Sequence, residues 1–364
     1  MKIVSIVGAR PQFVKLAEIC RHTEQDPAIN HYIIHTGQHY DYNMSQVHID
    51  QLAIPTPDRN LGVNGGTNTE NIAIMMLGIE KALKEHRPDI VLVYGDTDST
   101  VAGAMVACKL HIKLAHVEAG ARSGDPSMHE EVNRILVDSI SDLLLYSSRC
   151  QMNLPIQPWQ TGVFVGDLML DCMLRNRPTW NEGETVRIPG IPDPLKRREY
   201  YYMTLHRAET IDDKKSLQTV LNAIGGHLDH QVFLSAHPRL LSNINKFDIP
   251  VPAGIVMIPP QEYRMNIKLI QGAKKLLTDS GGMQREAFWL KTPCVTLRDR
   301  TEWPETLNFD RNIITGIDRE RIRQAIKMYQ TVNPKQDSHP LFGSGLAGHT
   351  LLNAVRTFVR SVSA

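Results

Sequence analysis

The fold class of this 364-residue chain follows from residues 89–120, DIVLVYGDTDSTVAGAMVACKLHIKLAHVEAG. The run DIVLVYGD (89–96) is typical of a buried strand, STVAGAMVACKL (99–110) of the helix after it, and KLAHVEAG (113–120) of the next strand. Parallel neighbouring strands need a crossover connection of this kind. The stretch therefore predicts a parallel sheet that is covered by helices on both faces.

The same alternation extends in both directions from this stretch. Strands are expected at 2–8, 31–37, 143–148 and 162–167, with helices at 69–86 and 130–142. The segment 175–196 breaks the pattern, because it is rich in proline and glycine, and we interpret it as a linker. Beyond it the alternation resumes, with strands at 200–206, 231–237, 254–260, 274–280 and 293–299, helices at 214–228 and 282–290, and a last helix at 348–360.

The chain is too long for one ordinary core, so two domains are expected. The sequence predicts an α/β protein with one Rossmann-like domain at 1–174 and a second, nucleotide-binding one at 175–345. A C-terminal helix at 346–364 is expected to join the first domain.

Composition argues against several classes of partner. The chain has 40 basic and 39 acidic residues, so it carries no electrostatic footprint for nucleic acid or an anionic membrane. Its five cysteines form no CxxC pair, which argues against a zinc site or a disulfide framework. The N-terminus lacks a signal-like apolar core, and no apolar run approaches about 18 residues. We expect a cytoplasmic protein without a metal ion.

Polar residues follow almost every expected strand. Open α/β sheets bind ligands beyond the carboxyl ends of their strands. The ends in the second domain carry His206, Arg207, His237, Gln261 and Arg298. Two such rows facing each other across a cleft would form one large site.

The strand-to-helix junction LLTDSGGMQREA (276–287) predicts an anion site. Amides at a helix start are unpaired, and Gly281 and Gly282 would let a phosphate approach them, with Ser280 as a further donor. The alternative is a plain turn with Ser280 as the helix cap. Cations at other strand ends favour the phosphate interpretation, and they are Arg10, Lys15, His206 and Arg207. Glu286, one turn further on, suits a ribose hydroxyl, so a nucleoside diphosphate is expected.

A second constellation consists of Asp96, Glu118 and Glu130. The first two follow buried strands and the third opens a helix, where carboxylates of raised pKa could exchange protons with a substrate. The alternatives are helix capping, an ion pair with Arg122, and compensation of the helix dipole, which we favour for Glu131. His116 shares a strand face with Glu118, but no histidine cluster indicates a metal.

Ordered motifs across residues 1–316 resemble those of the non-hydrolysing UDP-N-acetylglucosamine 2-epimerases. They include GARPQFVKL, HTGQHYD, YGDTDST, HVEAGARS, HEEVNRILVDSISD, TLHRAET, AHPR, PPQEY, LTDSGGMQREA and LRDRTEWPE. The resemblance implies a glycosyltransferase-B-like fold, no cofactor, a cytoplasmic homodimer and a role in cell-surface polysaccharide synthesis. Matched to the family's motifs, the residues implied in catalysis are Asp96, Glu118, Glu130 and His206, and those in substrate binding are Arg10, Lys15, Arg134, Gln261, Ser280, Gly281, Gly282 and Glu286.

The resemblance also implies a mechanism. UDP would leave before the C2 proton or together with it, and a 2-acetamidoglucal would form. Reprotonation from the other face with return of UDP would invert C2. Arg10, His206, Ser280 and the glycine amides would stabilise the departing diphosphate. The three carboxylates would handle the proton. UDP-GlcNAc would thus be converted to UDP-ManNAc.

Three departures from the family pattern leave the sugar open. Trp303 stands where many members have arginine, Asn266 where an aromatic residue is common, and His129 where proline is usual. The exact residues within the motifs are more similar to those of the 2-epimerases of UDP-2,3-diacetamido-2,3-dideoxy-glucuronic acid. A hydrolysing epimerase that releases UDP and ManNAc is the other alternative. The segment HTGQHYDYNM (35–44) differs from its counterpart in those family members that are activated by their substrate, so we expect activation by substrate to be weak or absent.

Overall fold

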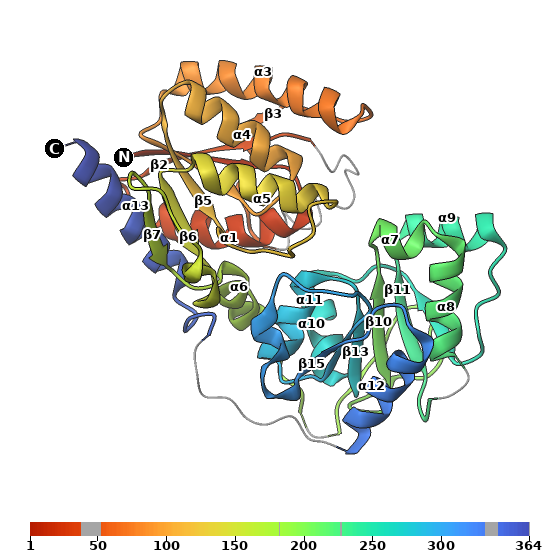
Figure 1. Ribbon diagram of the computed structural model, residues 1–364. Coiled ribbons are helices and arrows are strands. Elements are labelled where there is room, and N and C mark those ends of the chain that lie inside the picture. The colour runs from red at the N-terminus through yellow and green to blue at the C-terminus, as the bar shows by residue number, and fades with distance from the viewer. Residues whose placement is uncertain (38–51, 182, 226–227, 332–340, 364) are drawn as a thin grey trace. The chain divides into compact units, whose positions relative to one another are not determined.

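A computed structural model describes residues 1–37, 52–181, 183–225, 228–331 and 341–363. The chain divides into two compact units, which are described separately (Figure 1). Unit 1 comprises Met1–Arg175 and Pro340–Ala364, and unit 2 comprises Asn176–His339. The segment 35–44, for which weak or absent activation by substrate was expected, lies mostly outside the described residues.

Unit 1 is built on a seven-stranded parallel sheet with the order β3-β2-β1-β4-β5-β6-β7. The strands are β1 (Lys2–Val7), β2 (Asn30–His35), β3 (Arg59–Asn60), β4 (Ile90–Tyr94), β5 (Lys113–Val117), β6 (Leu143–Tyr146) and β7 (Thr161–Phe164). The helices are α1 (Arg10–Glu24), α3 (Asn68–His86), α4 (Asp98–Lys109), α5 (His129–Ile140), η1 (Cys150–Asn153), α6 (Leu168–Asn176) and α13 (Ala347–Ser363).

Helices cover both faces of this sheet, with α3, α4 and α5 on one side and α1 and α13 on the other (Figure 1). The central strands β1, β4 and β5 are buried along nearly their whole length, as helices on both faces require. Helix α4 lies close to the sheet because it presents Gly103, where a Cβ would come within 2.8 Å of Ile6 and 3.0 Å of Val93. The glycine thus lets α4 pack directly against β1 and β4.

The C-terminal segment belongs to unit 1 from before its helix. The amide of Asp167 donates to the carbonyl of Phe342 at 2.9 Å, and the amide of Gly348 donates to Asp171 at 2.9 Å. Residues 341–345 were expected in the second domain, but these contacts tie the loop and α13 to unit 1. Sequence periodicity could not show this, because the loop has no apolar pattern of its own.

Unit 2 contains a six-stranded parallel sheet with the order β12-β11-β10-β13-β14-β15. The strands are β10 (Tyr201–Leu205), β11 (Val232–Ala236), β12 (Ile255–Ile258), β13 (Lys275–Thr278), β14 (Cys294–Thr296) and β15 (Asn312–Ile314). The helices are α7 (Ala208–Ile211), α8 (Lys214–Ile224), α9 (Pro238–Phe247), α10 (Tyr263–Gly272), α11 (Gly281–Trp289), η2 (Pro304–Asp310) and α12 (Arg319–Thr331).

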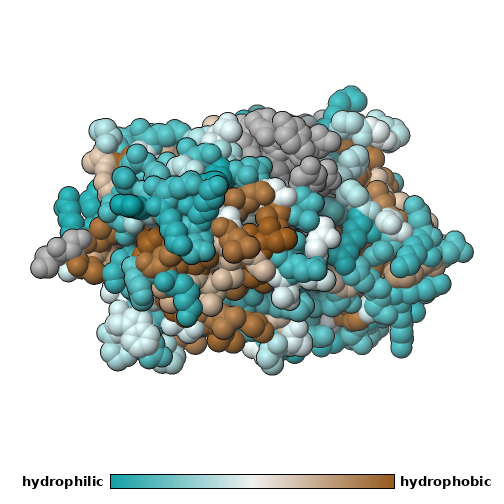
Figure 2. Space-filling model, turned by 90° about the horizontal axis from the view of Figure 1, so that it is seen from above, coloured by the Kyte–Doolittle hydropathy of each residue, from teal (hydrophilic) through white to brown (hydrophobic). Residues whose placement is uncertain are grey.

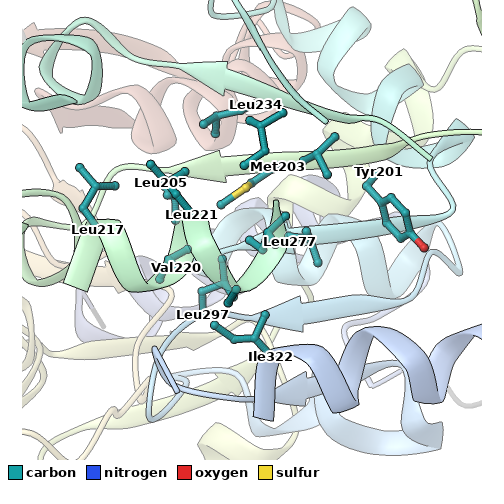
Figure 3. Close-up of a cluster of buried hydrophobic side chains, with 14 of the residues drawn as sticks. Tyr201, Met203, Leu205, Leu217, Val220, Leu221, Leu234, Leu277, Leu297 and Ile322 are labelled. Carbon is teal, nitrogen blue, oxygen red and sulfur yellow. The ribbon is translucent and has the colours of Figure 1, made fainter. Parts of the chain in front are cut away.

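The core of unit 2 joins its sheet to α8 and α12. Figure 3 shows side chains from strands and both helices meeting in one cluster, among them Met203, Leu221, Leu277 and Ile322. All four are fully buried. Helix α8 was expected to reach residue 228 but ends at Ile224, because the glycine at Gly225 leaves the helical conformation.

The segment interpreted as a linker, 175–196, is packed onto unit 2. Its short strands β8 (Thr185–Val186) and β9 (Leu195–Lys196) pair antiparallel. Trp180 donates its indole N–H to the carbonyl of Lys268 at 3.0 Å, and the Lys268 ammonium lies 5.3 Å from its ring centroid. The composition of the segment reflects tight turns rather than a free tether.

The predicted α/β class with two Rossmann-like domains is confirmed. The expected strands are present, whereas the short edge strands β3 and β15 were not expected from the sequence. Within the described residues, none of the helices combines the length and apolar character that a bilayer span requires.

Candidate active site

Two of the predicted carboxylates lie at the carboxyl edge of the unit 1 sheet. All seven strands are parallel, so β4 and β5 end at the same edge, and Asp96 and Glu118 follow them directly. Residue pairing aligns Tyr94 with Val117, the last residues of the two strands. The topology therefore brings these two turns together.

Asp96 is paired with a buried arginine. The Arg134 guanidinium donates to the Asp96 carboxylate and, at 3.0 Å, to Glu131. Asn133 donates its side-chain amide to the Asp96 carbonyl at 2.9 Å. The EExNR motif on α5 therefore holds the Asp96 turn through both its asparagine and its arginine.

Glu131 has a structural role in this arrangement, in addition to the compensation of the helix dipole that the sequence predicted. Its carboxylate accepts from the amides of Ser123 and Gly124, at 2.8 and 3.1 Å, as well as from Arg134. Burial raises the pKa of Glu131, but these hydrogen bonds outweigh it and hold the pKa below its ordinary value. The residue anchors the loop between β5 and α5.

Glu118 forms an ion pair with Lys15, whose ammonium lies 2.8 Å from its carboxylate. Both side chains are nearly buried, and both approach the backbone at Gly95. Glu118 itself has φ of +71°, in the left-handed region that a non-glycine residue seldom occupies. Such strain often marks a functional position.

Glu130 lies near a carboxylate that the sequence interpretation did not select, Asp98. Asp98 begins α4 and is half-buried. Burial raises its pKa, and the charge of Glu130 adds to the rise, whereas Asn133 and His129 oppose it. The spacing of YGDTDST was the available signal, because Asp98 lies two residues after Asp96.

Unit 2 places His206 and Arg207 beside Asp279, a fully buried carboxylate at the end of β13. The Asp279 oxygens accept from the amides of His206 and Arg207, each at 2.9 Å, and from the His206 ring nitrogen Nδ1 at 2.8 Å. This contact directs Nδ1–H of the ring toward Asp279, while about half of the imidazole surface stays exposed. The other ring nitrogen, Nε2, is thus oriented for a ligand.

The junction at 278–283 shows why glycine stands at position 281. Ser280 caps α11 by accepting from the amide of Met283 at 3.5 Å. A Cβ on Gly281 would lie 3.1 Å from Nε1 and 3.2 Å from Cδ1 of Trp303. Trp303 is buried and stacks on the Arg285 guanidinium, 3.7 Å from its ring centroid. The glycine therefore admits a tryptophan behind the turn, a reason separate from access for a phosphate.

Replacing Gly281 by alanine is expected to lower the free energy of unfolding of unit 2 by about 1–3 kcal/mol, because the new methyl group overpacks against the held indole. Urea unfolding followed by tryptophan fluorescence measures the loss. In the double variant with Trp303→Phe, which removes the indole N–H, the penalty of Gly281→Ala should shrink. An equal penalty in both backgrounds would contradict the contact.

Arg298 is buried and its guanidinium is held by two carboxylates. It donates to Glu302 through two nitrogens at 3.0 and 3.1 Å and to Glu209 at 3.1 Å. Arg207 also lies 3.9 Å from Glu302. This network supports the loop before Trp303, and the predicted substrate contact of Arg298 stays a prediction.

The remaining predicted residues have separate places. His237 caps α9 by accepting from the amide of Arg239 at 3.3 Å, Gln261 donates to the Pro259 carbonyl at 2.6 Å, and Glu286 is buried within α11. Arg10 begins α1, and its side chain lies outside what the structure describes. In the described ranges no group of three or more His, Cys, Asp or Glu side chains is arranged to hold a metal ion.

Chemically, unit 1 offers carboxylates buttressed by Lys15 and Arg134, and unit 2 offers a capped helix start beside His206. The first set can exchange a proton with a carbon acid, and the second can hold an anion.

The chain resembles known proteins over most of its length. The family model for UDP-N-acetylglucosamine 2-epimerase matches residues 21–356. A UDP-N-acetylglucosamine 2-epimerase homolog of Methanococcus maripaludis is 41% identical over 98% of this chain and 99% of its own. The UDP-2,3-diacetamido-2,3-dideoxy-D-glucuronate 2-epimerase of Pseudomonas aeruginosa is 38% identical over 95% of this chain and 97% of its own.

A solved structure resembles the whole chain as well. The UDP-GlcNAc 2-epimerase of Methanocaldococcus jannaschii, in complex with UDP-GlcNAc and UDP, has a TM-score of 0.87 and 34% identity over 98% of this chain and 100% of its own. The family resemblance predicted from the motifs is confirmed. This chain belongs to the UDP-N-acetylglucosamine 2-epimerase family, whose members are isomerases.

Proposed function

We propose that the chain is a non-hydrolysing 2-epimerase that interconverts UDP-GlcNAc and UDP-ManNAc. The observation that carries the proposal is the pair Asp96 and Glu118, which lie at one sheet edge and are each held by a buried cation. The Methanocaldococcus jannaschii relative, in complex with UDP-GlcNAc and UDP, supports the choice of substrate.

The mechanism assigns the two units different tasks. In unit 2 the helix start at Ser280–Gly282 and the His206 imidazole stabilise the diphosphate as the C1–O bond breaks. In unit 1 a carboxylate takes the C2 proton, so the electron pair of the C–H bond forms the C1–C2 double bond of a 2-acetamidoglucal. A second carboxylic acid then donates a proton to the opposite face of C2, while UDP returns to C1.

Lys15 and Arg134 orient Glu118 and Asp96 through ion pairs before the proton is taken. Asp98, with Glu130 beside it, suits the acid role instead, because burial and the charge of Glu130 raise the pKa of Asp98. The carboxylates proposed as base, Asp96 and Glu118, therefore pair with positively charged side chains, whereas the proposed acid Asp98 has the carboxylate of Glu130 beside it.

Proton NMR of the purified protein with UDP-GlcNAc in heavy water tests the proposal. The expected result is a mixture of UDP-GlcNAc and UDP-ManNAc with deuterium at C2 and no net release of UDP. Release of UDP in proportion to turnover would show a hydrolysing epimerase instead. Absence of both reactions would reject the 2-epimerase assignment for this sugar.

The alternative substrate is UDP-2,3-diacetamido-2,3-dideoxy-glucuronic acid, named for the relative from Pseudomonas aeruginosa. Trp303 stacks on Arg285, and Asn266 accepts from the Tyr202 hydroxyl at 2.8 Å, so both unusual residues are engaged within unit 2. The ratio of kcat/KM for the two UDP-sugars decides between the substrates.

Because all five cysteines are free thiols, we place the protein in the reducing cytoplasm.

A homodimer is the assembly that we propose, through the outer faces of α3 and α5. Both helices cover the same side of the sheet, and both expose large apolar residues, namely Ile74, Leu77, Val132, Ile135 and Leu136. Figure 2 shows apolar side chains gathered among polar ones on the face seen from above. Beside Leu77 lie Glu80, Lys81, Lys84 and Glu85, so the face carries both signs of charge and can complement a second copy of itself.

Substituting Leu77 by lysine is expected to convert the dimer to a monomer, because the partner copy would have to bury a new charge. Light scattering after size-exclusion chromatography measures the mass. Trp159→Lys is the matched control, since Trp159 is similarly exposed but lies outside α3 and α5. A monomeric wild type would contradict the proposed assembly.

A further inference from the structure

The buried imidazole of His116 lies between two hydrogen-bond acceptors. Its ring nitrogen Nδ1 is 2.6 Å from an oxygen of Asp138, and Nε2 is 2.8 Å from the carbonyl oxygen of Gly95. A carbonyl oxygen can only accept, so Nε2 must carry a proton. An ionised Asp138 also only accepts, and then Nδ1 must carry a second proton.

Asp138 has the surroundings of an ionised carboxylate. Its second oxygen accepts from the amide of Gly120 at 3.0 Å and from the Arg122 guanidinium at 2.7 Å. Apart from His116, both the Gly120 amide and the Arg122 guanidinium donate to this carboxylate, which favours its ionised form. The shared geometry thus describes an imidazolium paired with a carboxylate, with no solvent exposure of the ring.

This pair joins the two turns that carry the catalytic candidates. Gly95 precedes Asp96, and Gly120 follows Glu118 by two residues. The His116 ring donates to the Gly95 carbonyl and so holds the first turn. The Asp138 carboxylate accepts from the Gly120 amide and so holds the second. Glu118 lies between these points with φ of +71°, a conformation that the chain keeps only if its surroundings enforce it.

We propose that His116 is a positioning residue that acts as a buried imidazolium, tying Gly95 to Asp138 and thereby holding Asp96 and Glu118 in their reactive arrangement. The inference rests on the proposed function for its catalytic consequence, whereas the charge of the ring does not depend on any substrate. His116 touches neither reacting atoms nor a ligand, and it acts through the two turns.

The imidazolium also adds a fixed positive charge behind the carboxylates. Beside its partner Asp138, ionisable groups on the adjoining elements include Lys15 on α1, Asp96 after β4, Glu118 after β5, Arg122 in the next loop, Arg134 on α5 and Tyr146 on β6. Removing one positive charge from this set makes ionisation of Asp96 and Glu118 less favourable. The acid limb of the kcat profile should then move to higher pH.

Nitrogen-15 NMR of the ligand-free protein tests the charge of the ring. At about pH 8, where an ordinary histidine with a pKa of about 6.5 is neutral, both ring nitrogens of His116 should appear as N–H donors. The His116→Asn variant identifies the signals among the 15 histidines. In Asp138→Asn the Nδ1 proton should be lost, because an amide can donate to a neutral ring.

Kinetics test the positioning role. We expect His116→Asn to lower kcat about 10- to 100-fold, the range for a lost hydrogen bond to a charged group, with little change in KM and with the acid limb shifted upward. Asp142→Asn is the matched control, since Asp142 accepts from the Leu114 amide at 2.9 Å and pairs with Lys113 at the amino end of the same strand. Its kcat should stay at the wild-type value.

Two results would overturn the inference. One is a single protonated ring nitrogen at His116 in the wild type at about pH 8. The other is a kcat profile of His116→Asn that falls without a shift of the acid limb, as loss of stability alone would produce. Inactivity of the wild-type protein toward UDP-sugars would reject the proposed function instead and leave the NMR result standing.

Discussion

Substituting Asp96 by asparagine or Glu118 by glutamine is expected to lower kcat by about 10²–10⁴, the usual worth of a positioned acid or base. Each substitution keeps the shape of the side chain but removes its charge as well as its ability to take or give a proton, so the ion pair with Arg134 or Lys15 is also lost. Stopped assays with UDP-GlcNAc measure kcat, and calorimetry measures UDP affinity. We expect UDP affinity to change little, because the groups proposed to hold the diphosphate belong to unit 2.

The matched control is Asp89→Asn. Asp89 lies just before β4, as Asp96 lies after it, and it accepts from the amide of Lys2 at 2.7 Å on the opposite edge of the sheet. Its substitution should leave kcat unchanged. If the Asp96 and Glu118 variants epimerise at near wild-type rates, the two carboxylates are structural and the proposed mechanism is wrong.

Glu130→Gln separates the acid from the base. Elimination and reprotonation occur on opposite faces of the sugar, so one carboxylate variant should still release UDP and leave a glycal. Deuterium uptake at C2 would then fall more steeply than UDP release. If Glu130 and Asp98 form the acid side, Glu130→Gln and Asp98→Asn should both show this pattern, whereas Glu118→Gln should not.

Much of the fold was predictable because long buried strands leave a strong apolar signal. β4 is a continuous apolar run, and β1 departs from one only at Lys2 and Ser5. β3 has two residues and β15 three, too few for periodicity to detect. The loop at 341–345 was assigned to the wrong side of the boundary because its attachment depends on backbone hydrogen bonds such as Asp167 to Phe342, which no side-chain pattern records.

The sequence predicted which residues of the candidate site lie at the strand ends, but it predicted less well which side chains they contact. Parallel topology places Asp96 and Glu118 together, and the motif spacing indicated both. Glu130 and Glu131 have different roles because only Glu131 is buried against Arg134. Asp279 was visible in the DSGG stretch but was not selected, because its role depends on a neighbouring strand that carries His206.

Replacing Asp279 by alanine is expected to lower the free energy of unfolding of unit 2 by about 3–5 kcal/mol, the range for breaking a buried charged partnership. The substitution leaves the amides of His206 and Arg207 and the His206 imidazole without their common acceptor. Three of the four tryptophans, Trp180, Trp289 and Trp303, lie in unit 2, so urea unfolding of the full chain followed by fluorescence reports on it. UDP affinity should fall in the same variant, because the orientation of His206 is lost.

The variant Asp279→Asn isolates the charge, since its amide oxygen still accepts one hydrogen bond. Burial raises the pKa of Asp279, but the charge of His206 and the hydrogen bonds from His206 and Arg207 outweigh it, so the net pKa lies below the ordinary value. A carboxyl group with a depressed folded pKa stabilises the fold fully above its unfolded pKa of about 3.9 and loses that contribution as the pH falls through the folded pKa. The stability gap between wild type and Asp279→Asn should therefore be constant near neutral pH and narrow below about pH 4. A gap that stays constant into acid would show that shape, rather than the charge of Asp279, holds the His206–Arg207 turn.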